Sequence, residues 1–224
     1  METNFGFAHF ISNCDVMGKG VLGLLLMLSI ASWYLIVTKS IANMAAHKQA
    51  DAFLKQFWDA SSLQEMRAKL GTENNAFSEL ARQALAIDSG TQRGMGKLLA
   101  AGGMAEYLTR VLRNGIDQEA ASVEHGLTVL ASAGSAAPFV GLFGTVWGIY
   151  HALVGIGMSG QGTLDKVAGP VGEALIMTAV GLAVAIPAVL AYNAFTRSNR
   201  IWLAQLDNFA HDLYALLTMG EKKC

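Results

Sequence analysis

Charged residues and cysteines are both scarce in this sequence. Charged residues make up 15% of the 224 residues and hydrophobic residues 53%, whereas a soluble globular protein carries about 25% charged residues. The only two cysteines, Cys14 and Cys224, lie at opposite ends of the chain, which excludes a secreted disulfide scaffold. A net charge of -1 without a basic block disfavours a nucleic-acid-binding protein.

Three long stretches account for the shortage of charge. Residues 20–38, 126–164 and 167–196 contain no Lys, Arg or Asp, and Glu173 is the one acidic residue among them. Each stretch exceeds the roughly 18 apolar residues that are typical of a transmembrane helix. We found no strand pattern and no internal repeat. The sequence therefore predicts an all-α integral membrane protein, with three transmembrane helices extended into a helical cytoplasmic domain.

The first apolar stretch differs from a cleaved signal peptide. Glu2 and Asp15 precede it, Lys19 is the only Lys or Arg before it, and it is longer than the roughly 7 to 15 apolar residues of a signal sequence. We expect it to remain as the first span.

Basic residues near the spans predict the orientation of the chain. Lys19 and Lys166 flank the spans on one side, and seven residues flank them on the other: Lys39, Lys48, Lys55, Arg110, Arg113, Arg197 and Arg200. Because Lys and Arg concentrate on the cytoplasmic side of membrane proteins, we expect a periplasmic N-terminus and a cytoplasmic C-terminus. The predicted segments are an outer N-terminal segment (1–19), transmembrane helix 1 (20–38), a cytoplasmic helical domain (39–125), transmembrane helix 2 (126–154), a periplasmic turn (155–166), transmembrane helix 3 (167–196) and a cytoplasmic helical tail (197–224).

Helical spacing of apolar residues continues beyond the membrane segments. From Met104 to Leu130 the spacing is interrupted by no breaker stronger than Gly115, which predicts one helix from about residue 104 to residue 153. The same spacing after Thr196 predicts an inward extension of the third span. Between residues 41 and 87 we expect helices broken near Gly71 and Gly90.

Motifs for catalysis or cofactor binding are missing. Gly155, Gly157 and Gly160 match the spacing of a dinucleotide-binding loop, but they lie in the predicted turn between two spans rather than after a strand. The five histidines are scattered along the chain. We therefore predict no catalytic residue, no cofactor and no metal site.

Polar side chains inside the spans are the candidate functional residues. A carboxylate such as Glu173 costs about 2.5 to 3.5 kcal/mol at the bilayer centre, so it normally faces a bundle interior or a water-filled cavity; a role in packing alone is the alternative. Taken separately, Thr145 and Thr178 are each explained by a hydrogen bond from the hydroxyl to a backbone carbonyl of their own helix. If the second and third spans are antiparallel neighbours, however, all three residues lie in the outer half of the membrane.

Small residues and prolines accompany these polar groups. Gly144 and Gly181 permit close helix approach, within one chain or between copies. Pro138 and Pro187 each release a backbone carbonyl that another group must satisfy. This combination favours the lining of a pore or the socket for another helix.

Two segments carry a resemblance to a known family. Ser135-Ala-Ala-Pro-Phe-Val-Gly-Leu-Phe-Gly-Thr-Val-Trp-Gly-Ile149 and the stretch from Gly169-Pro-Val-Gly-Glu-Ala to Tyr192-Asn193 resemble the signature helices of the MotA/TolQ/ExbB proton-channel family. Within it the chain resembles the ExbB branch most, in a short three-span form without an extended N-terminal region. The TolQ branch, which drives Tol-Pal envelope maintenance, is the nearest alternative.

The resemblance implies a function in the bacterial inner membrane. It implies a homopentamer in the lipid bilayer whose pore holds single-span ExbD helices, and which uses the proton-motive force to drive TonB and thereby the import of iron-siderophores and vitamin B12. It assigns Thr145, Thr178 and Glu173 to the pore lining, and it places the main proton-carrying aspartate on ExbD. A passive membrane scaffold is the alternative from a different class.

Overall fold

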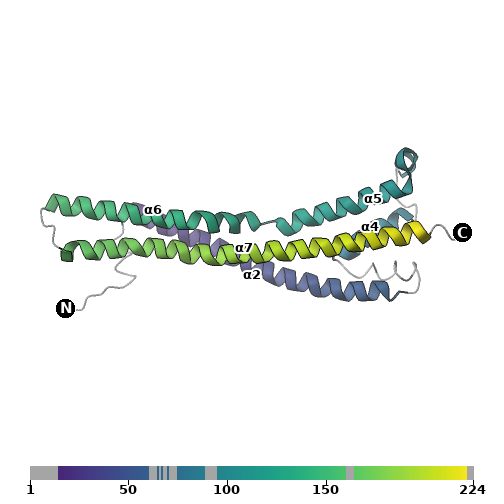
Figure 1. Cartoon of the computed structure of the whole chain (residues 1–224), viewed down its shortest axis with the longest axis horizontal. Coiled ribbons are helices and arrows are strands. Elements are labelled where there is room, and N and C mark those ends of the chain that lie inside the picture. Colours follow the sequence, from purple (N-terminus) through teal and green to yellow (C-terminus); the bar gives the residue numbers. More distant parts are fainter. Residues whose placement is uncertain are drawn as a thin grey trace. The chain divides into compact units, whose positions relative to one another are not determined.

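The computed structural model describes residues 15–60, 65, 67, 70, 75–88, 95–159 and 164–220. The predicted breaks near Gly71 and Gly90 lie outside these residues. Within them the chain is almost entirely helical and contains no strand. The helices are α2 (Val16–Trp58), α4 (Ala76–Asp88), α5 (Met95–Glu124), α6 (Leu127–Ser159) and α7 (Leu164–Gly220) (Figure 1).

Three helical stretches are long and apolar enough to cross a membrane, as the composition predicted. They are α2, the stretch from α5 into α6, and α7. Helix α7 alone has 57 residues, about 85 Å at 1.5 Å per residue. It confirms that the third apolar stretch continues as one helix into the charged tail.

The predicted uninterrupted helix from residue 104 to residue 153 is wrong at one position. Helix α5 ends at Glu124 and α6 begins at Leu127. Between them Gly126 has a φ of 80°, a left-handed conformation that glycine adopts without the Cβ penalty and that commonly ends helices. Gly115, the breaker considered from sequence, lies inside α5.

The predicted turn after the second span also begins too early. Helix α6 continues through Gly155 and Gly157 to Ser159. Glycine costs about 0.5–1 kcal/mol relative to alanine inside a helix, which weakens a helix without ending it. The two glycines therefore lie on a helix and not in a phosphate-binding loop.

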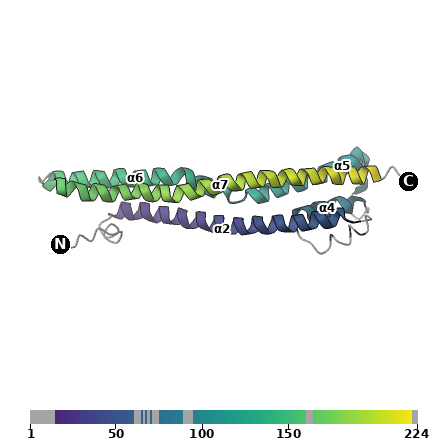
Figure 2. The same ribbon diagram turned by 60° about the horizontal axis from the view of Figure 1, so that its bottom comes forward.

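The chain divides into two compact units. Unit 1 contains Met1–Thr38 and Gly126–Phe195, and unit 2 contains Lys39–His125 and Thr196–Cys224. In unit 1, α6 and the first half of α7 run side by side in opposite directions (Figure 2). The first half of α2 packs against both of them, because its buried Val21 and Leu25 share an apolar cluster with Ala137 and Met177.

Unit 2 has an aromatic core. Phe77 of α4 contacts Trp202 and Phe209 of α7 edge to face, with ring centroids 5.1 and 5.5 Å apart. Phe53 and Phe57 of α2 pack against the same Phe209 at 6.3 and 5.3 Å. Such edge-to-face pairs contribute about 0.5–1.5 kcal/mol each beyond the area they bury. The core thus joins helices that are distant in sequence.

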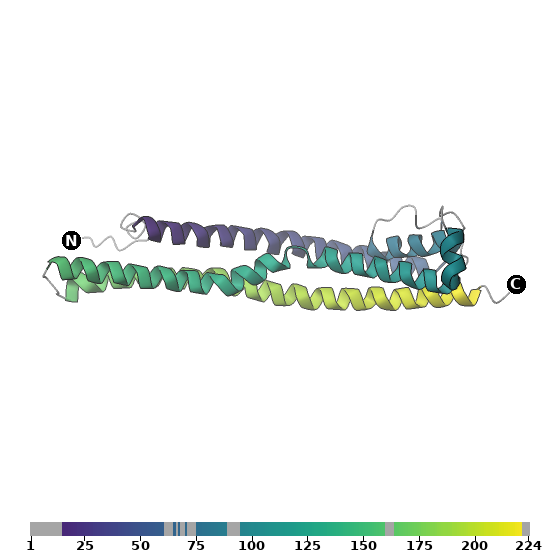
Figure 3. The same ribbon diagram turned by 90° about the horizontal axis from the view of Figure 1, so that it is seen from above.

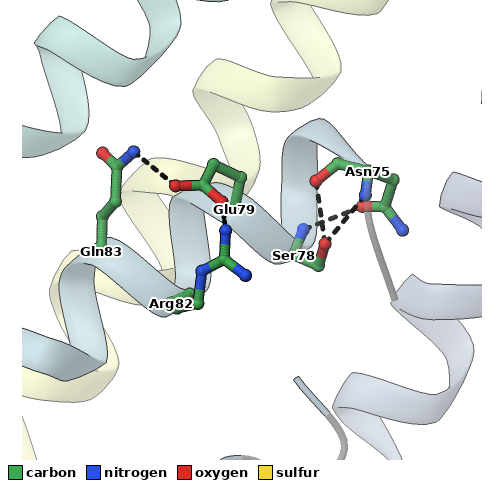
Figure 4. A network of polar contacts seen from close by, with 5 residues as sticks. All are labelled: Asn75, Ser78, Glu79, Arg82 and Gln83. Carbon is green, nitrogen blue, oxygen red and sulfur yellow. Dashed lines mark hydrogen bonds and ion pairs between the residues drawn. The ribbon is translucent and has the colours of Figure 1, made fainter. Parts of the chain in front are cut away.

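Helix α4 begins at a reciprocal cap (Figure 4). The Asn75 side chain accepts a hydrogen bond from the Ser78 backbone N–H at 2.8 Å, and the Ser78 hydroxyl accepts one from the Asn75 N–H at 3.0 Å. One turn further on, Glu79 pairs with Arg82 and accepts a hydrogen bond from Gln83. Two backbone donors that the helix leaves unpaired are satisfied in this way.

Candidate functional site

Glycine brings the backbones of α6 and α7 into contact in unit 1. A Cβ atom added at Gly141 would lie 2.6 Å from the Met177 carbonyl oxygen, and one added at Gly181 would lie 2.6 Å from the Ala137 carbonyl oxygen. Real Cβ atoms essentially never make contacts this short. The two helices can therefore pack this closely only with glycine at both positions. Figure 3 shows the ribbon of α6 running along the first half of α7.

A pair of hydroxyl groups lies within this interface. The Thr145 Oγ1 is 2.6 Å from the Thr178 Oγ1 and 3.0 Å from the Ala174 carbonyl oxygen. Thr145 also lies 3.2 Å from the Gly141 carbonyl of its own helix, and it is only 6% exposed. The sequence reading of Thr145 as a residue bonded solely to its own helix is incomplete, because two of its three neighbouring oxygens belong to α7.

Glu173 lies on α7 next to Ala174 and is half-buried. The five residues from Glu173 to Thr178 correspond to about 140° around a helix with 3.6 residues per turn. The Thr145 and Thr178 hydroxyls meet across one interface. Glu173 lies one helical turn before Met177, which packs against Gly144 in the same interface. The hydroxyls of Thr145 and Thr178, two of the three polar residues that the sequence singled out, are thus in direct contact.

The two glycines and two prolines that the sequence singled out for helix packing lie on α6 and α7. Gly144 faces Val21 of α2 and Met177 of α7, since a Cβ added there would lie 3.0 Å from the Val21 Cγ1 and 3.2 Å from the Met177 Cβ. Gly181 faces α6, as described above. Both glycines thus pack against neighbouring helices of the same chain. Pro138 lies inside α6 and Pro187 inside α7.

A further polar contact in unit 1 was not expected from the sequence. The Trp147 indole Nε1 of α6 donates a hydrogen bond to the Asp15 Oδ2 at 2.7 Å. The other carboxylate oxygen, Oδ1, accepts the Gly18 backbone N–H at 2.7 Å. These two hydrogen bonds, that of Gly18 first, lower the pKa of Asp15. Aspartate just before an apolar run is a helix-start signal, but its partner Trp147 is 132 positions away.

A second junction lies in unit 2, where α5 ends. The Val123 carbonyl oxygen accepts hydrogen bonds from the Lys39 Nζ of α2 at 2.9 Å and from the Asn199 Nδ2 of α7 at 2.8 Å. Asn199 is buried. The last carbonyls of a helix lack partners in the helix itself, so α2 and α7 supply donors where α5 stops.

Among the residues that the structure describes, no cluster of three or more His, Cys, Asp or Glu side chains could hold a metal ion. The polar groups described at the α6–α7 interface are the Thr145 and Thr178 hydroxyls, which can donate and accept hydrogen bonds, and the Ala174 carbonyl oxygen, which can only accept them.

Comparison with known proteins identifies similar sequences along nearly the whole chain. Residues 82–208 match the model of the MotA/TolQ/ExbB proton channel family. The biopolymer transport protein ExbB of Xanthomonas campestris pv. campestris is 39% identical, over 98% of this chain and 91% of its own. ExbB of Neisseria meningitidis is 45% identical, over 88% of this chain and 90% of its own. The Tol-Pal system protein TolQ of Pseudomonas aeruginosa is 34% identical, over 92% of this chain and 90% of its own.

Proposed function

Because the chain belongs to the MotA/TolQ/ExbB proton channel family, we propose that it is an ExbB-type subunit that couples the proton-motive force to import across the outer membrane. In this proposal it forms a homopentamer around an ExbD-like single-span protein and drives a TonB-like protein. Its termini lie as the basic residues predict, with the N-terminus in the periplasm. One charge that crosses 100 mV releases about 2.3 kcal/mol, so several protons suffice for a mechanical step.

The hydroxyl pair of Thr145 and Thr178 is the observation that supports this function best. Each hydroxyl can donate one hydrogen bond and accept others. With oxygens 2.6 Å apart and the Ala174 carbonyl within reach of Thr145, the pair can reverse its donor and acceptor roles without moving either helix. This is the property that a relay between water and a titrating carboxylate requires.

The carboxylate of such a relay comes from a partner in this proposal. The two threonines themselves carry no titratable group. Thr178 is only half-buried in the single chain, which leaves its side of the interface accessible to another helix. The family resemblance assigns the proton-carrying aspartate to the ExbD-like partner.

Replacement of Thr145 by valine tests the relay. Valine keeps the shape of the side chain but removes the hydroxyl, so Thr178 loses its partner. We expect normal insertion and assembly with loss of TonB-dependent siderophore uptake in a strain that lacks its own ExbB and TolQ. Thr145→Ser, which keeps the hydroxyl, is the matched control and should retain uptake. Wild-type uptake by Thr145→Val would refute the relay.

Glu173 is tested separately with glutamine and alanine. Both changes lower the cost of placing this position in a membrane, so neither should reduce the amount of inserted protein. We expect a larger loss of uptake in Glu173→Ala than in Glu173→Gln, because glutamine keeps a polar side chain of the same length. Complete loss in Glu173→Gln would instead mean that the charge or its protonation is required. Full uptake in Glu173→Ala would leave only a packing role.

The TolQ-type function is the second candidate, supported by the match to TolQ of Pseudomonas aeruginosa over most of both chains. The two candidates differ in the process that they restore. In a strain lacking ExbB and TolQ, an ExbB-type protein restores growth on iron-siderophores, whereas a TolQ-type protein restores resistance to detergents. If the protein is a passive scaffold, neither process depends on Thr145. The mass of the complex that is purified together with the products of the neighbouring genes tests the partners and the stoichiometry.

A further inference from the structure

A row of aromatic side chains lies along α6 near the start of α2. Phe143, Trp147 and His151 follow one another at intervals of four residues, so they lie on one face of the helix. The Trp147 ring stacks on Phe143 with centroids 6.2 Å apart and lies 4.8 Å from the His151 ring. The Trp147 ring thus has an aromatic neighbour one turn before it and another one turn after it.

The indole N–H is directed at the carboxylate that begins α2. One oxygen of Asp15 accepts the indole proton and the other accepts the Gly18 backbone N–H, each at 2.7 Å. The Asp15 carboxylate thus caps the N-terminus of α2 and also links it to α6 by a hydrogen bond. Charge-assisted hydrogen bonds of this kind are stronger than bonds between neutral groups.

The turns of α2 that follow the cap pack against the threonine interface. Val21 lies against Gly144, the residue before Thr145. Leu25, one turn later, is fully buried in the cluster that contains Met177, the residue before Thr178. The first turns of α2 therefore pack against the residues that directly precede Thr145 and Thr178 in α6 and α7.

We propose that Asp15 and Trp147 act as positioning residues for the hydroxyl pair: their hydrogen bond holds the first turns of α2 against α6 and thereby keeps Thr145 and Thr178 within hydrogen-bond distance. The inference rests on the proposed function of the pair. Neither residue touches the moving proton in this scheme.

Two substitutions separate this hydrogen bond from the cap and from the aromatic row. Asp15→Asn keeps a side-chain oxygen, and asparagine is as good an N-cap as aspartate, but its amide nitrogen cannot accept the indole proton. Trp147→Phe keeps the aromatic row but removes the donor. Trp33→Phe is the control, because Trp33 is an exposed tryptophan of the same helix, α2.

Hydrogen exchange and uptake are then measured on the full-length protein, in nanodiscs and in cells respectively. We expect each single variant to speed amide exchange in residues 17–25 by about threefold to tenfold, the effect of one lost hydrogen bond, and to lower siderophore uptake. The double variant should match the single variants, since both remove the same interaction. Trp33→Phe should behave as the wild type in both measurements.

Unchanged exchange in both single variants, or additive effects in the double variant, would overturn the inference. Faster exchange with wild-type uptake would also overturn it, while the proposed function would stand if Thr145→Val is inactive in the same strain. If Thr145→Val is active as well, the proposed function fails, and the positioning role fails with it.

Discussion

The hydroxyl of Thr145 has one proton and three oxygens within reach. It can donate its proton to the Ala174 carbonyl while it accepts a hydrogen bond from Thr178, or it can donate to Thr178 instead. In the second case the Ala174 carbonyl keeps only the hydrogen bond within α7. A buried hydroxyl with a choice of acceptors avoids the cost of about 1–3 kcal/mol that an unpaired polar group would incur. Because the hydroxyl has more than one acceptor, its hydrogen bond can change direction while the group stays paired.

The charge of Asp15 predicts a dependence on pH at the start of α2. The Gly18 N–H and the Trp147 indole hold the pKa of Asp15 below its usual value, and His151 and Lys19 add smaller effects in the same direction. A carboxyl group with a lowered pKa in the folded state stabilises the fold above its unfolded pKa of about 4. That contribution is lost as the pH falls through the lowered value.

The Trp147 indole signal in a nitrogen-15 NMR spectrum reports this titration. We expect the midpoint of its chemical-shift change to lie below the ordinary pKa of aspartate, and we expect no such change in Asp15→Asn. The indole of Trp33 serves as an internal reference. A midpoint at or above the ordinary range of aspartate would contradict the hydrogen-bonding pattern.

At the scale of the elements, contact between the backbones of α6 and α7 depends on glycine. We expect Gly181→Ala to lower the free energy of unfolding by about 1–3 kcal/mol, because its methyl group would overlap the Ala137 carbonyl oxygen and the helices must separate. Thermal unfolding of the detergent-solubilised protein measures the change.

Gly172→Ala is the matched control on the same helix. No atom lies within 4 Å of a Cβ added at Gly172, so the loss of backbone freedom should leave the protein unchanged or stabilise it by about 0.5–1 kcal/mol. Equal effects of the two alanines would mean that helix propensity, and not contact between helices, decides the outcome.

The end of α5 gives a second prediction at this scale. Asn199→Ala removes one of the two side-chain donors to the Val123 carbonyl, so we expect a loss of about 1–2 kcal/mol in the free energy of unfolding. Arg200→Ala, at the exposed neighbouring position, should stay within about 0.5 kcal/mol of the wild type. An equally small effect of Asn199→Ala would show that Lys39 alone satisfies the carbonyl.

At the scale of the whole molecule, the two cysteines test the proposed orientation. Cys14 and Cys224 lie on opposite sides of the membrane if the positive-inside rule holds for this chain. We expect a membrane-impermeant thiol reagent to label Cys14 in intact spheroplasts and Cys224 only after permeabilisation. The single variants Cys14→Ser and Cys224→Ser identify each signal, and labelling of Cys224 in intact spheroplasts would reject the orientation.

The sequence by itself predicted the helical class, the three apolar helices and the polar residues inside them. These properties depend on runs of neighbouring residues: the free energy of transfer into lipid is summed along a helix, so composition alone reveals it. The helical extension of the third span followed from its apolar spacing in the same way. Thr145 and Thr178 were visible because threonines stand out among apolar residues.

The tertiary structure alone decided which of these residues meet. Thr145 and Thr178 are 33 positions apart and their hydroxyl oxygens lie 2.6 Å from each other, and Asp15 and Trp147 are 132 positions apart and share a hydrogen bond. Gly126, rather than Gly115, interrupts the second long helix. Gly144 and Gly181 pack within one chain, because the approach of two helices depends on the side chains of both. Such pairings depend on the register between helices, which no single run of residues encodes.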